Sequence, residues 1–193
     1  MSATVGLTSL PDLPLEHIAS YLSFPDLVEL AASSPALTHL QPRLQEVTGE
    51  DFSLSAGPRD SHFCPGTYLD VAILTRGLKS VKMVFLWKDQ GWGNRKGQVW
   101  LQLVRRGEVI ADSREQYLAL APHSGRTNRG GTLELEGREV EVVGHPVVSL
   151  AARGDTLRVA RNIGGGGGHQ LTVSQFNMTI VHKKELDEEG WTD

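Results

Sequence analysis

Residues 171–180 read LTVSQFNMTI, and the spacing of their apolar side chains decides the fold class of the larger part of the chain. The apolar residues of the first half stand at odd positions and those of the second half at even positions: Leu171, Val173, Phe176, Met178 and Ile180. Alternation of this kind is typical of a strand that buries one face. One extra residue would return both halves to the same face, so the switch predicts a β-bulge near Ser174-Gln175.

Patterns typical of strands recur between residue 81 and this stretch. They fall at residues 81–87, 99–104, 132–135, 139–143 and 157–159. The first two are apolar on both faces, as buried strands are, and the next two alternate apolar with charged residues. Seven or eight strands without a convincing helix predict an antiparallel, jelly-roll-like β-sandwich over residues 67–183.

The first fifty residues have a different period. Apolar residues recur there at helical spacing in three short segments, each of which opens with a proline: Pro14, Pro25 and Pro35. The face of the third segment is formed by Leu37, Leu40, Leu44 and Val47. The chain is therefore predicted to be α+β, with a three-helix module at 8–48, a linker at 49–66, the sandwich, and a charge-rich, fraying tail at 184–193.

Residues 13–30, LPLEHIASYLSFPDLVEL, resemble an F-box. That pattern has a Leu-Pro opening, an Ile-x-x-x-Leu helix and a Pro-Asp-Leu-x-x-Leu segment. The resemblance implies docking on the Skp-family adaptor of a cullin–RING ubiquitin ligase, in an SCF-type complex. The matching positions are Leu13, Pro14, Ile18, Leu22, Leu27 and Leu30. Ala36 and Leu37 depart from the basic residue and Trp that F-boxes often carry. The alternative is that these leucines pack on the sandwich.

Residues 87–97, WKDQGWGNRKG, lie between two apolar strands and are predicted to connect them at one end of the sandwich. Their Asp-Gln-Gly-Trp segment resembles one found in other β-sandwich domains, and the overall scheme resembles galactose-binding-like jelly rolls. Some F-box proteins hold glycans on such a sandwich. The candidate ligand-binding residues are Asp89, Gln90, Trp92, Asn94, Arg161 and Asn162. The alternative is structural, with Trp87 and Trp92 closing the core and Asp89 capping turn amides.

Composition narrows the function classes. The net charge of −4 disfavours nucleic acid as the main partner, and a single cysteine, Cys64, allows no internal disulfide. No signal peptide or apolar run long enough to cross a membrane is evident, so a cytoplasmic or nuclear location is expected. The seven histidines show no paired metal-ligand spacing, so no metal or other cofactor is expected.

Three functions remain open at this stage. The leading hypothesis is a substrate-recognition subunit, without a catalytic group of its own, that joins the Skp adaptor and cullin complex to an unknown protein or glycoprotein target. The second is an intracellular carbohydrate- or small-ligand-binding sandwich, with the helices as a structural cap. The third is an enzyme of β-sandwich or cupin type, against which the lack of metal-ligand clusters argues.

Overall fold

The structure is a computed structural model, and it describes residues 24–33, 43–90, 95–114, 119–120, 135–165 and 167–183. The chain divides into two compact units. The larger unit runs from Leu44 to His182, and the smaller one combines residues 1–43 with residues 183–193. Within the described residues, no helix has the length and apolar character needed to cross a membrane.

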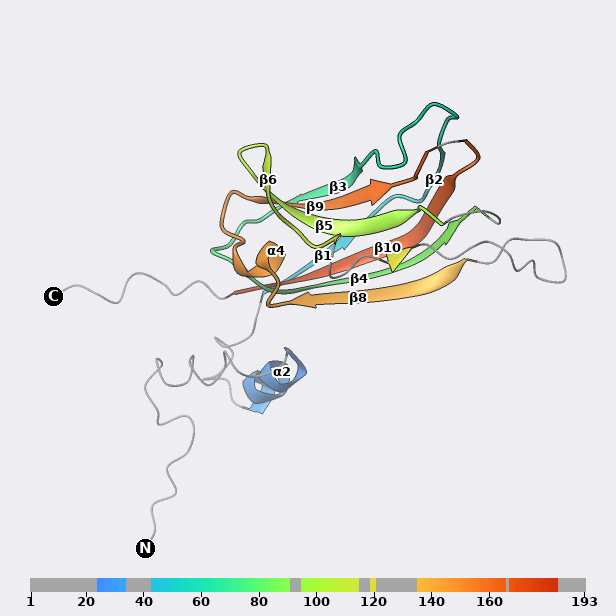
Figure 1. The fold of residues 1–193 in the computed structure, drawn as a ribbon. Coiled ribbons are helices and arrows are strands. Elements are labelled where there is room, and N and C mark those ends of the chain that lie inside the picture. Colours follow the sequence, from blue (N-terminus) through green and yellow to red (C-terminus); the bar gives the residue numbers. More distant parts are fainter. Residues whose placement is uncertain are drawn as a thin grey trace, which may run out of the picture. The chain divides into compact units, whose positions relative to one another are not determined.

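The larger unit is a β-sandwich of two antiparallel sheets (Figure 1). The first sheet has the order β1-β10-β4-β8, with β2 also on β10; the second has the order β3-β9-β5-β6, with β7 also on β5. Its strands are β1 (Leu44–Thr48), β2 (Phe52–Ser55), β3 (Gly66–Ala72), β4 (Leu78–Asp89), β5 (Gln98–Arg105), β6 (Glu108–Asp112), β7 (Ala119–Leu120), β8 (Glu136–Val143), β9 (Thr156–Asn162) and β10 (Gln170–His182). Early and late strands therefore pair side by side in each sheet, which is the strand order of a jelly roll.

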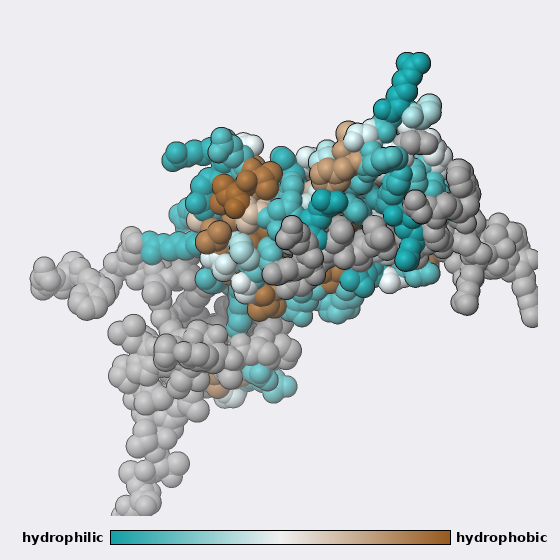
Figure 2. All heavy atoms as spheres, viewed as in Figure 1, coloured by the Kyte–Doolittle hydropathy of each residue, from teal (hydrophilic) through white to brown (hydrophobic). Residues whose placement is uncertain are grey.

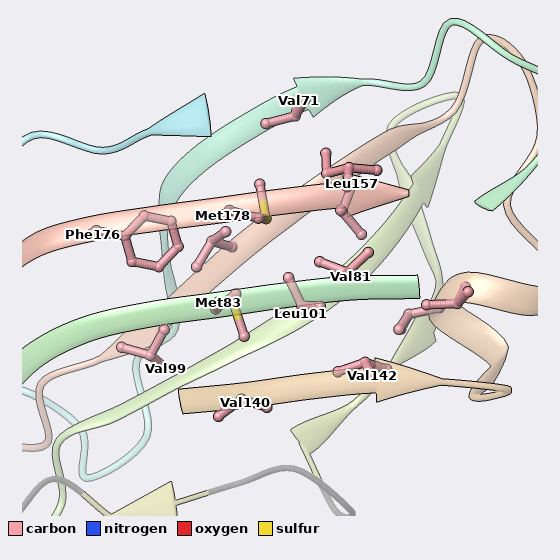
Figure 3. Close-up of a cluster of buried hydrophobic side chains, with 14 of the residues drawn as sticks. Val71, Val81, Met83, Val99, Leu101, Val140, Val142, Leu157, Phe176 and Met178 are labelled. Atoms are coloured by element: carbon pink, nitrogen blue, oxygen red, sulfur yellow. The ribbon is translucent and has the colours of Figure 1, made fainter. Parts of the chain in front are cut away.

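The core lies between the two sheets. Alternate residues of facing strands, among them Val81 and Met83 of β4 and Leu101 of β5, point into it (Figure 3). A one-turn helix, α4 (Pro146–Ser149), adds two buried valines to the same cluster. The prediction of a jelly-roll-like β-sandwich is confirmed.

The β-bulge predicted at Ser174-Gln175 is also confirmed. Ser174 pairs with Leu86 and Asn177 pairs with Val84, so two residues of β10 stand opposite one residue of β4. Gln175 has a positive φ of 52°. The extra residue reverses the side-chain alternation in the second half of β10, so the apolar residues of both halves of the strand face the core.

The predicted α+β fold with a three-helix module is wrong, because the described chain is almost entirely β. The second helical segment does form a helix, α2 (Phe24–Ser33), in the smaller unit. The second half of the third segment is instead β1, which pairs along its whole length with β10. Leu44 and Val47 have the spacing of a helical face. Residues 44–48 nevertheless form a strand, because the β-branched pair Val47-Thr48 favours extended backbone and the segment pairs with β10.

The larger unit begins earlier than the predicted boundary at residue 67. Both β1 and β2 pair with β10, so residues 52–55 of the predicted linker form an edge strand. The described residues do not include the first predicted helix, residues 34–42 of the third predicted helix, or the tail at 184–193.

Hydrophobic side chains also reach the surface at one end of the sandwich (Figure 2). This end carries α4 and the turn between β5 and β6. The exposed residues there include Leu74, Val109, Ile110 and Leu150.

Gly165 and Gly167, between β9 and β10, are packed against the loop before β3. A Cβ atom at Gly165 would collide with the backbone oxygens of Asp60 and Ser61. Gly164 has a φ of 90°, and a side chain there would run into Lys96. These glycines permit close backbone contact.

We expect Gly165→Ala to lower the free energy of unfolding by about 2 kcal/mol, because backbone atoms cannot yield as a flexible side chain can. The matched control is Gly137→Ala in β8, whose Cβ would meet only the Leu86 side chain at 3.8 Å. Urea unfolding of both variants measures the difference. Equal stability of the two variants would contradict the packing described for Gly165.

Candidate functional site

Asp89, at the end of β4, is a structural residue. Its side chain is only 1% exposed. Its carboxylate accepts hydrogen bonds from the backbone amides of Gln90 (2.6 Å), Lys96 (2.6 Å) and Gly97 (2.9 Å). The three bonds close the β4–β5 connection at its base, which is the turn-capping role that the alternative interpretation gave to Asp89.

Asn162, at the end of β9, has a similar structural role. It is 2% exposed. Its side-chain oxygen accepts from the Cys64 amide at 2.9 Å, and its side-chain nitrogen lies 3.3 Å from the carbonyl oxygens of His62 and Lys96. Asn162 thereby ties two loops to β9 and has no surface left for a ligand.

The other four predicted ligand-binding residues differ in their surroundings. Gln90 is buried at 5% exposure. Trp92 and Asn94 lie outside the described residues. Arg161 is the one described candidate that opens onto a hollow. The structure therefore does not gather the described candidates into one ligand site.

Arg161 points toward the interior of the sandwich. It shares the strand face of Leu157 and Val159, both of which belong to the core. Its guanidinium carbon lies 5.5 Å from the centroid of the Phe52 ring, a cation–π distance. Among the described residues, no hydrogen bond or ion pair to Arg161 is present, and burial lowers its pKa. Within the part of the chain that the structure describes, no protein group therefore accepts from the five donors of this partly buried guanidinium.

An open hollow of about 460 Å³ lies beside this guanidinium. It is bounded by the β1–β2 connection, the start of β3 and the end of β9. The lining residues are Thr48, Gly49, Glu50, Asp51, Phe52, Leu54, Thr67, Tyr68, Leu69 and Arg161. The volume lies in the range of small-molecule sites in proteins.

Two bulges shape the hollow, one in each sheet. In β3 the register shifts between Thr67 and Leu69, which leaves Tyr68 as the extra residue. In β10 the bulge brings Phe176 inward, where its ring centroid lies 5.1 Å from that of Tyr68. Gly49 makes room for this pair, because a Cβ there would collide with the Tyr68 hydroxyl. Bulges often re-aim side chains beside functional sites.

The lip of the hollow is acidic and held in place. The Tyr68 hydroxyl donates to the Glu50 carbonyl oxygen at 2.8 Å, and the Gln175 amide donates to the Asp51 carboxylate at 2.8 Å. Burial, together with the nearby charges of Asp51 and Glu50, raises the pKa of Tyr68 from 10.0 to about 12. The lip therefore has a negative potential at the phenol, while Arg161 supplies a positive charge in the same hollow.

Few features of the sequence alone indicate the hollow or its lining residues. Half of the lining residues lie in the stretch predicted to be a linker. The signal that could have found the site is the alternation of Leu157, Val159 and Arg161, which places a charge on an apolar strand face.

No protein-family profile matches the chain, and no curated protein matches it. Among solved structures, the infectious bursal disease virus VP2 subviral particle is similar over 73% of this chain and 33% of its own, at 12% identity and a TM-score of 0.46. The chain therefore spans about a third of that protein's length. Eiger TNF from S. frugiperda is similar over 79% of this chain and 99% of its own, at 10% identity and a TM-score of 0.43.

A third similar structure is the EclA C-terminal domain, described as a sugar-binding protein. It is similar over 72% of this chain and 78% of its own, at 12% identity and a TM-score of 0.35. All three TM-scores are below 0.5, so the assignment of fold and site depends on the strand order and geometry given above.

The raised pKa of Tyr68 predicts a loss of stability at alkaline pH. The native phenol keeps its proton up to about pH 12, whereas an unfolded tyrosine loses it near pH 10. This contribution is complete below pH 10 and is lost as the pH rises toward 12. We expect wild type to lose stability relative to Tyr68→Phe over that interval, as measured by urea unfolding between pH 8 and 12.

Tyr21 and Tyr117 are present in both proteins, so the difference between them isolates Tyr68. A stability difference that stays constant across this pH range would contradict the assigned environment of the phenol.

Proposed function

We propose that this protein is a non-catalytic β-sandwich module that binds a small ligand, such as a carbohydrate, in the hollow beside Arg161. The observation that carries the proposal is the inward-facing guanidinium, whose donors have no partner among the described residues. A partly buried guanidinium without a protein partner among the described residues can donate its hydrogen bonds to a ligand that occupies the hollow.

The surroundings of Arg161 support the same function. Phe52, Leu54 and Leu69 give the hollow an apolar wall, and Thr48 and Thr67 add hydroxyl groups near its rim. Polar and apolar groups thus share the lining of the hollow, and a concavity with convergent polar groups is a common form of small-molecule site.

The ubiquitin-ligase adaptor role does not receive the same support. The family comparison returns no F-box, and the third predicted helix is in part strand β1. Of the positions matched to the F-box pattern, Leu27 and Leu30 lie in α2, and the other four lie outside the described residues. The ligand-binding function is therefore the one we carry forward.

Ligand-observed NMR with a mixed panel of small molecules tests this function. The panel contains neutral sugars, sugar acids, amino sugars and small carboxylates. We expect at least one compound to receive saturation from wild type and to bind Arg161→Ala roughly ten- to a hundredfold more weakly, because a charge-assisted hydrogen bond contributes about 1.5–3 kcal/mol.

The matched control is Arg138→Ala, which removes an exposed arginine from edge strand β8. This variant should bind as wild type does. The proposal fails if no compound binds wild type, or if the two arginine variants bind equally well.

A further inference from the structure

The charges around the hollow point to the kind of ligand it selects. At neutral pH, Glu50 and Asp51 contribute −2 and Arg161 contributes +1, so the ionised groups of the lining sum to −1. The carboxylate wall of Glu50 and Asp51 offers acceptors and the guanidinium wall of Arg161 offers donors, beside the hydroxyl groups of Thr48 and Thr67. A ligand that fills the hollow must satisfy both walls.

Anions satisfy only one of the two walls. A carboxylate would pair well with Arg161, but it would bring a third negative charge close to Glu50 and Asp51. The pKa of Tyr68 shows that these two carboxylates already act on groups inside the hollow. An ammonium group fails at the other wall, because it has no lone pair to accept a bond from the guanidinium.

Hydroxyl groups satisfy both walls, since each one donates and accepts. Two adjacent hydroxyls on a ring can donate to the Glu50 carboxylate and accept from Arg161 at once. The carbon-bound face of such a ring can lie against the apolar wall of Leu54 and Leu69.

We infer that the hollow selects a neutral, polyhydroxylated ring with adjacent hydroxyl groups, that is, a neutral monosaccharide unit, over its acidic counterpart. The inference rests on the proposed function. Glu50 is the specificity-determining residue, because its carboxylate is exposed at the lip and its backbone carbonyl, not its side chain, holds Tyr68. Asp51 has a structural bond to the β10 bulge in addition to its charge.

Competition NMR with matched sugars provides the test. The probes are glucose, galactose and mannose, their uronic acids, and 2-deoxyglucose. We expect at least one neutral hexose to bind wild type, and to bind at least tenfold more tightly than its uronic acid. For glucose, we expect removal of the 2-hydroxyl to weaken binding about fivefold or more.

A charge-neutral variant assigns the selectivity to the lip. Glu50→Gln should reduce the preference for the neutral sugar over its acid by at least fivefold. The matched control is Glu136→Gln, an exposed carboxylate at the start of β8, which should leave the preference unchanged.

The possible outcomes separate this inference from the function on which it rests. Tighter binding of the uronic acid, or binding in the mixed panel only by compounds without adjacent hydroxyls, would overturn the inference and leave the hollow as a ligand site. An unchanged preference in Glu50→Gln would overturn the role given to Glu50. Binding that Arg161→Ala does not affect would remove the site itself.

Discussion

The extra residue that β10 carries opposite Phe85 of β4 is the constraint on which much of this structure depends. A strand of thirteen residues with a single parity would send either Leu171 or Phe176 out of the core. The bulge at Gln175 keeps both inside. It also presents the Gln175 amide to Asp51, at the point where the neighbouring edge strand is interrupted between β1 and β2. The bulge thus places the apolar side chains of β10 in the core and, through the bond between Gln175 and Asp51, holds the lip of the hollow between β1 and β2.

The placement of the hollow follows from this constraint. Phe176 supports Tyr68, and Tyr68 in turn lies 4.8 Å from Phe52, whose ring faces Arg161. These aromatic contacts connect the bulge in the first sheet to the charged end of β9 in the second. The β4–β5 connection, by contrast, is closed by the amides that bind Asp89.

Sequence reasoning succeeded where the pattern was long and periodic. The strands around residues 81–87 and 99–104 and the bulge of β10 follow from alternation, which directly reflects burial. It failed at Leu44 and Val47, because two apolar residues three apart have helical spacing, whereas the pairing with β10 that makes this segment a strand leaves Leu44 exposed. Of the residues that line the hollow, Arg161 was among the predicted candidates, whereas Phe52 was assigned to a linker and Tyr68 was not singled out. Their approach depends on two bulges and on Gly49, and contacts between such distant segments leave no local signal.

We propose that Arg161 serves ligand recognition and not the stability of the fold. Its guanidinium carbon lies 5.5 Å from the centroid of the Phe52 ring, and this partly buried group has no hydrogen bond among the described residues. Arg161→Met preserves the apolar stem and removes the charge, so it isolates the guanidinium. The direct test is the free energy of urea unfolding of Arg161→Met and wild type without ligand. The account predicts that the variant is at least as stable as wild type. A loss of about 2 kcal/mol or more would show that the guanidinium serves the fold, and would contradict the claim.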